Sequence, residues 1–179
     1  MPMGARSTSR VLTPHVDGAA MQADLVSWEK DRNAWCRQQA EVLRSSGAAF
    51  DAKGLDWEKI AEELDGLSRS DRRELECRLT VLIAHLSTWL RGGIGGQRNA
   101  NGWRLTIREQ RRRIRGIVRE SPSLKAHPER SFALCFADAR LDAADQLALT
   151  LNPFPKEPPF TLEQVLDPGF PPDLMGSEA

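Results

Sequence analysis

Three polar side chains at the edges of apolar helical rows could together do chemistry: Glu63, His85 and Arg111. At 100° per residue, each lies beside the apolar row of its own predicted helix, so each is expected to lie partly inside an interface between helices. A carboxylate beside an imidazole can fix its tautomer or raise its pKa, as a general base requires. An arginine alongside would bind an anionic group. One hypothesis is therefore an enzyme or anion-binding protein with these residues in a polar seam, and the alternative is structural ion pairing at the edge of the core.

Arginines dominate a second stretch, residues 104–119, which contains seven of them and a single acid, Glu109. A row of guanidinium groups on one helix face could follow a phosphate backbone. The nucleic-acid-binding candidates are Arg104, Arg108, Arg112, Arg115 and Arg119. The alternative is that the arginines pair with residues 56–65, where five acids accompany one lysine.

Motifs for metal or cofactor chemistry are absent from the sequence. Its three histidines include no H-E-x-x-H and no Glu-x-x-His pair, so we expect no metal and no cofactor. The glycine run 92–96 lacks the Gly-Lys-Ser/Thr of a phosphate-binding loop and is interpreted as a flexible turn. Cys36, Cys77 and Cys135 are predicted to be reduced, mostly buried thiols.

Length and composition fit one ordinary domain. The chain has 179 residues, of which 40% are hydrophobic, and 25 basic residues balance 25 acidic ones. A formal net charge of zero gives no global attraction to nucleic acid or to an anionic membrane. No apolar run reaches the roughly 18 residues of a membrane-spanning helix, and cytoplasmic residence is the default expectation.

Apolar periodicity predicts that helices position these residues, since strand-like alternation is nearly absent. The clearest row steps by 4, 3, 4 and 3 residues through Leu75, Leu79, Leu82, Leu86 and Trp89. Ser68-Arg69-Ser70-Asp71 has the form of a capping box, which favours a new helix there. The tryptophans are expected in the core, although Trp89 and Trp103 could instead line a pocket mouth. The predicted helices cover residues 21–45, 57–67, 71–91, 101–120 and 128–151.

The tail differs in composition, because seven of the eleven prolines fall between Pro153 and Pro172. Thr161 and Gln164 open one short helical turn by the capping-box rule. We therefore expect an all-α fold, a bundle of four to five amphipathic helices with a Pro-rich C-terminal strap. The expected organisation is a flexible tail at 1–20, a bundle at 21–151 and a strap at 152–179 packed on the bundle.

Several sequence blocks, in order, resemble the family called "domain of unknown function 29", small proteins common in cyanobacteria and proteobacteria. They are residues 62–76, His85-Leu86 with Trp89, Trp103 with residues 107–111, residues 121–124, and residues 159–167. The sequence departs from the usual pattern at Ser68, at Ser87-Thr88 and at Phe136. The resemblance implies an all-helical bacterial protein, and it brings no established activity.

With no specific catalytic motif, the sequence favours a binding protein over an enzyme. We expect a cytoplasmic protein–protein interaction module that self-associates, because regular apolar stripes also suit packing against a second copy. Two alternatives remain open: nucleic-acid binding through the helix at 104–119, and an enzyme or anion-binding protein built on Glu63, His85 and Arg111.

Overall fold

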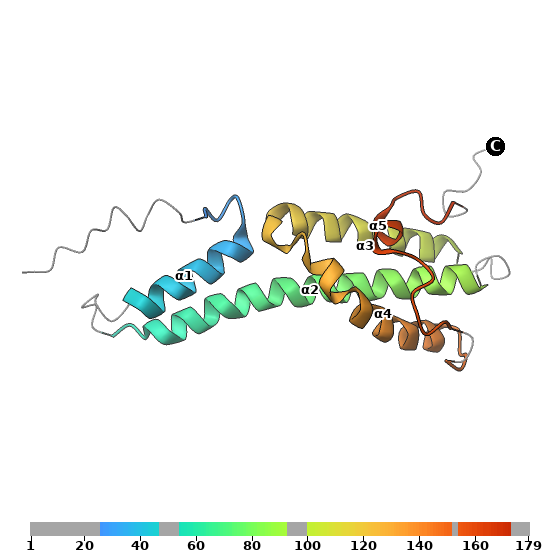
Figure 1. Cartoon of the computed structure of the whole chain (residues 1–179), viewed down its shortest axis with the longest axis horizontal. Helices are drawn as coiled ribbons and strands as arrows, with labels where there is room; N and C mark the ends of the chain where they lie inside the picture. The colour runs from blue at the N-terminus through green and yellow to red at the C-terminus, as the bar shows by residue number, and fades with distance from the viewer. Residues whose placement is uncertain (1–25, 47–53, 93–99, 152–153, 173–179) are drawn as a thin grey trace, which may run out of the picture.

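The computed structural model describes residues 26–46, 54–92, 100–151 and 154–172 of the chain, and every regular element in these ranges is a helix. Figure 1 shows their arrangement, with the helix α2 as the spine of the molecule. The elements are α1 (Arg32–Ser46), α2 (Trp57–Gly92), α3 (Ala100–Glu120), the short 3-10 turn η2 (Pro122–Leu124), α4 (His127–Gln146) and α5 (Leu162–Leu166). The predicted all-α class is confirmed.

The spine α2 is a single continuous helix, so the predicted break near Gly66 and Ser68 is wrong. The Ser68 side chain does not cap a new helix. It is fully buried, and its backbone carbonyl accepts a 2.8 Å hydrogen bond from the Asn33 side chain of α1. A glycine inside a helix costs about 1 kcal/mol, and packing of α1 along this half of α2 offsets that local preference.

Two other helix ends differ from the prediction. Residues 26–31 precede α1 instead of belonging to it, because the Asp31 carboxylate caps the helix by accepting the Ala34 N–H at 2.8 Å. The predicted start at residue 21 lies outside the described residues. The helix α4 ends at Gln146 and not near Leu151, since the backbone enters the left-handed region at Ala148 (φ 51°). The capping box of Thr161 and Gln164 is confirmed by both of its hydrogen bonds.

The helices α1 and α3 both run antiparallel to α2 and meet end to end near its middle (Figure 1). We call α1 with the first half of α2 the arm, and the rest the bundle. In the bundle, α3 and α4 pack on α2, and the segment carrying α5 crosses α3. The main core comprises Leu75, Leu79, Leu82, Ile83, Ala84, Leu86, Ile107, Ile114, Leu124, Cys135, Phe136, Ala139, Phe160 and Val165.

A buried polar junction joins the arm to the bundle where α1 begins. The Asp31 carboxylate accepts hydrogen bonds from the backbone N–H and the hydroxyl of Ser123. Two residues further on, the Asn33 N–H donates to the hydroxyl of the buried Ser121 at 3.2 Å. Because these bonds link segments about 90 positions apart, they fix the start of α1 against the turn that follows α3.

Candidate functional site

The predicted seam of Glu63, His85 and Arg111 does not form. Glu63 and His85 lie on the same helix, and their separation of 22 positions corresponds to about 33 Å at 1.5 Å per residue. The Glu63 side chain is 75% exposed and lies 3.7 Å from the Lys59 ammonium. The His85 Nδ1 atom is 2.9 Å from the Val81 carbonyl of its own helix, a structural contact. The structure therefore gives no support for a catalytic group built from these three residues.

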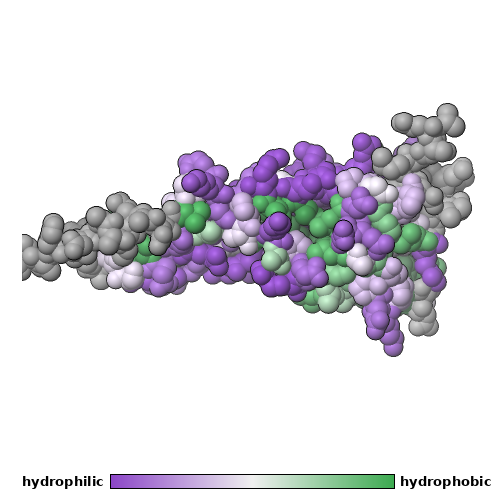
Figure 2. Space-filling model, turned by 45° about the horizontal axis from the view of Figure 1, so that its top comes forward, coloured by the Kyte–Doolittle hydropathy of each residue, from purple (hydrophilic) through white to green (hydrophobic). Residues whose placement is uncertain are grey.

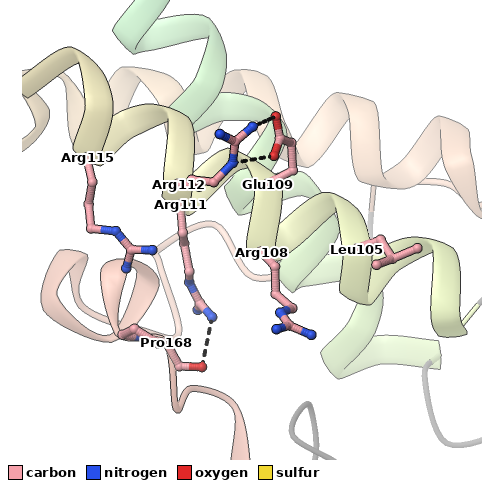
Figure 3. Close-up of a pocket in the computed structure, with 7 residues that line it drawn as sticks. All are labelled: Leu105, Arg108, Glu109, Arg111, Arg112, Arg115 and Pro168. Carbon is pink, nitrogen blue, oxygen red and sulfur yellow. Dashed lines mark hydrogen bonds and ion pairs between the residues drawn. The ribbon is translucent and has the colours of Figure 1, made fainter.

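Arg111 anchors the C-terminal segment and does not offer its guanidinium to a ligand. Its side chain is buried, and it donates to the carbonyls of Val165 (2.8 Å), Pro168 (3.5 Å) and Phe170 (2.7 Å). Figure 3 shows it reaching from α3 to this segment. Burial lowers the pKa of Arg111 from 12.5 to about 10, so the group stays charged at neutral pH.

The acidic residues 56–65 do not face the arginines of α3, so that prediction is wrong. Arg44 of α1 pairs with two of these acids, Glu58 at 3.1 Å and Asp65 at 2.8 Å. The reason is topological: this half of α2 packs against α1, whereas α3 runs along the other half. The acids at the start of α2 therefore do not neutralise the arginines of α3.

Two of the arginines of α3 form ion pairs with an acid of the same helix. Arg112 and Arg113 both bind Glu109, at 2.8 Å and 2.7 Å. These hydrogen bonds, from Arg113 first and then from Arg112, lower the pKa of Glu109. Among the other candidates, Arg104 is half-buried at the start of α3, whereas Arg108, Arg115 and Arg119 are exposed.

Two neighbouring hollows border this helix. The first, of about 430 Å³, is lined by Leu105, Arg108, Glu109, Arg111, Arg112, Arg115 and Pro168. In Figure 3, Arg108 and Arg115 flank Arg111, while Arg112 turns away towards Glu109. This hollow is strongly basic. Arg108 and Arg115, the exposed arginines on either side of Arg111, form no ion pair with Glu109, whose partners are Arg112 and Arg113.

The second hollow, which we call the α3 hollow, is larger, at about 620 Å³. Its floor is apolar and comes from three elements: Ile114 and Val118 of α3, Pro128 of α4 and Leu166 of α5. Its rim is basic, formed by Arg115, Arg119 and Lys125, and no carboxylate is among its lining residues. On the face seen in Figure 2, hydrophobic residues gather over the bundle and hydrophilic ones border them. An apolar floor inside a cationic rim suits a ligand that is both apolar and anionic.

Lys125, Pro128 and Leu166 line this site but were not among the residues predicted from the sequence. Ile114 follows Ile107 at helical spacing in the sequence, but that spacing gave no sign that Val118, one turn further along α3, stays partly exposed at the edge of a hollow. That depends on where the C-terminal segment crosses α3, and the crossing is set at Arg111. The only local sign of this site in the sequence was Lys125, a basic residue shortly after Ser121-Pro122-Ser123.

The thiols give no second site. Cys36 and Cys135 are buried, and burial raises the pKa of each, which keeps it protonated and unreactive. Cys77 is exposed, which departs from the expectation of mostly buried cysteines. In the described part of the chain, no three His, Cys, Asp or Glu side chains are grouped so that they could hold a metal ion. None of the described helices has the length and hydropathy needed to cross a bilayer.

These features define an all-helical protein with a basic, partly apolar surface hollow. The chain belongs to the family "Domain of unknown function DUF29", which it matches over residues 27–171. Its fold is similar to that of an alpha-helical protein of unknown function from Rhodospirillum rubrum, with a TM-score of 0.67 and 19% sequence identity over 79% of this chain and 90% of that one. A search of curated proteins gives no match.

Proposed function

We propose that the protein is a protein–protein interaction module, and that its α3 hollow binds an acidic amphipathic helix of a partner protein. The observation that carries the proposal is the apolar floor of Ile114, Val118, Pro128 and Leu166 enclosed by Arg115, Arg119 and Lys125. Amphipathic helices bind such grooves by their apolar face, and flanking acids would meet the cationic rim. We also expect the protein to act in the cytoplasm, since its three cysteines form no disulfide.

The apolar floor favours a protein ligand over a nucleic acid. A phosphate backbone would meet the rim but would not cover the partly exposed apolar side chains of Val118 and Leu166. Neither hollow is lined by an aromatic side chain on which a base could stack. An amphipathic helix that carries both leucines and acids would contact the apolar floor and the cationic rim at the same time.

A direct test uses a designed peptide of about 16 residues, since shorter isolated helices are marginal in water. Its leucines repeat at i, i+3 and i+7, and glutamates flank them. We expect the double variant Arg115→Glu, Arg119→Glu to bind this peptide at least about tenfold more weakly than the wild type, because like charges then oppose each other across the rim. Fluorescence anisotropy of the labelled peptide measures both dissociation constants.

A matched control reverses the same number of charges elsewhere, by Arg69→Glu, Arg73→Glu on the exposed side of α2. This variant should keep the wild-type affinity, and a peptide with lysines in place of the glutamates should not bind. Failure of the acidic peptide to bind at low salt would overturn the proposal, as would equal losses in both double variants.

Nucleic-acid binding is a second candidate, favoured by the exposure of Arg108, Arg115 and Arg119 on one side of α3. Three phosphate contacts predict an affinity that falls roughly 40-fold between about 50 and 200 mM salt. Arg108 discriminates the two candidates, because it lies outside the α3 hollow. If nucleic acid is the ligand, Arg108→Ala should weaken binding of short RNA or DNA as much as Arg119→Ala does. A mobility-shift series without binding at low salt would eliminate this candidate.

A further inference from the structure

The arm exposes an apolar row on one side of α2. Ile60 is 37% exposed and Leu67 is 53% exposed, while Leu64 between them is half-buried. The side of α2 that packs against α1 is a different one, because Ala61 and Ser68 are fully buried. At 100° per residue, Glu63 falls within about 60° of both Ile60 and Leu67. This side of the arm is therefore an acidic amphipathic helix face.

The first turns of α2, at the outer end of the arm, remain negative after their ion pairs are counted. Residues 56–65 contain five acids and one lysine. Arg44 binds two of these acids, Glu58 and Asp65, and Lys59 is shared between Glu62 and Glu63. The α3 hollow carries the opposite charge, with Arg115, Arg119 and Lys125 around an apolar floor. The two surfaces are thus complementary in charge, and each is apolar at its centre.

We infer that the partner helix is the arm of a second copy of this chain: the face of Ile60, Glu63 and Leu67 docks into the α3 hollow of another molecule. This inference rests on the proposed function, because it names the occupant of the same hollow. The arm and the hollow are separate surfaces of one chain, so two molecules can exchange both contacts about a two-fold axis. Such an exchange closes the assembly as a dimer.

Complementary charge reversal tests this contact in the full chain. The arm variant is Glu63→Arg, Glu74→Arg, which changes two acids on the same side of α2 as Ile60 and Leu67. The hollow variant is Arg115→Glu, Arg119→Glu. All four side chains are exposed, so both variants are expected to fold. Light scattering coupled to size exclusion should give wild type a mass of twice 20.0 kDa. Each variant alone should dissociate at least about tenfold more readily.

Mixing the two variants is the decisive step. An arm made basic fits a hollow made acidic, and the unchanged acidic arm fits the unchanged basic hollow, so the mixture should recover the dimer. A control variant with the same charge change on α4, Asp138→Arg, Asp142→Arg, should dimerise like the wild type. A wild type that stays monomeric at all concentrations, or a mixture that fails to recover the dimer, would overturn the inference.

The designed peptide separates this inference from the proposed function. A monomeric wild type that still binds the peptide through Arg115 and Arg119 would refute self-docking and leave the interaction module standing. Absence of both the dimer and peptide binding would refute both.

Discussion

Replacing Arg111 with alanine is expected to lower the free energy of unfolding by about 3 kcal/mol, because hydrogen bonds from a charged donor contribute more than neutral ones and three carbonyls lose their partner. For a chain of this length, that loss corresponds to a melting temperature roughly 6–12 °C lower. Denaturation in urea, followed by tryptophan fluorescence, measures the change. Hydrogen exchange should report the same loss locally, as faster exchange in residues 162–167.

Two comparison variants make this expectation specific. Arg112→Ala removes an exposed arginine from the next position, whose bond is to Glu109 on the same helix, and should cost less than about 1 kcal/mol. Arg111→Lys keeps the charge but lacks the planar set of donors that reaches three carbonyls, so it should be nearly as unstable as the alanine variant. An Arg111→Ala protein within about 0.5 kcal/mol of the wild type would contradict the anchoring role.

Asp31→Ala should cause a loss of similar size, about 3 kcal/mol, because one buried carboxylate both caps α1 and binds Ser123. Loss of a helix cap accounts for about 1 kcal/mol, and the remainder comes from hydrogen bonds to a charged acceptor. Circular dichroism during thermal denaturation measures the shift in stability.

The matched control for Asp31 is Asp142→Ala, which removes an exposed acid from α4 and should change the free energy of unfolding by no more than about 0.5 kcal/mol. Asp31→Asn should be intermediate, since it retains acceptor capacity without the charge. Equal stability of the Asp31→Ala and Asp142→Ala proteins would show that the junction does not hold the arm to the bundle.

Local periodicity accounts for the part of the fold that the sequence predicted well. Leu75, Leu79, Leu82 and Leu86 were placed on one row from their spacing alone, and all four are fully buried. The capping box at Thr161 was predictable for the same reason, since its bonds span only three residues. Such features depend on the helix itself and not on what packs against it.

Long-range packing accounts for what the sequence could not predict. Ser68 and Gly66 look like a helix boundary locally, yet α1 packs over them and α2 continues. Arg111 was correctly placed at the edge of an apolar row, but its partners lie 54 to 59 residues further along the chain. The candidate site follows the same pattern: the arginines of α3 were predicted, whereas its apolar floor depends on where α4 and α5 cross that helix.

The most direct measurement of the central claim is an NMR titration of the isotope-labelled protein with the designed acidic peptide. The amide signals of Ile114, Val118, Lys125 and Leu166 should shift together and saturate, while those around His85 should stay in place. Saturating shifts centred on any other surface, or no shifts at all, would contradict the claim that the α3 hollow is the binding site.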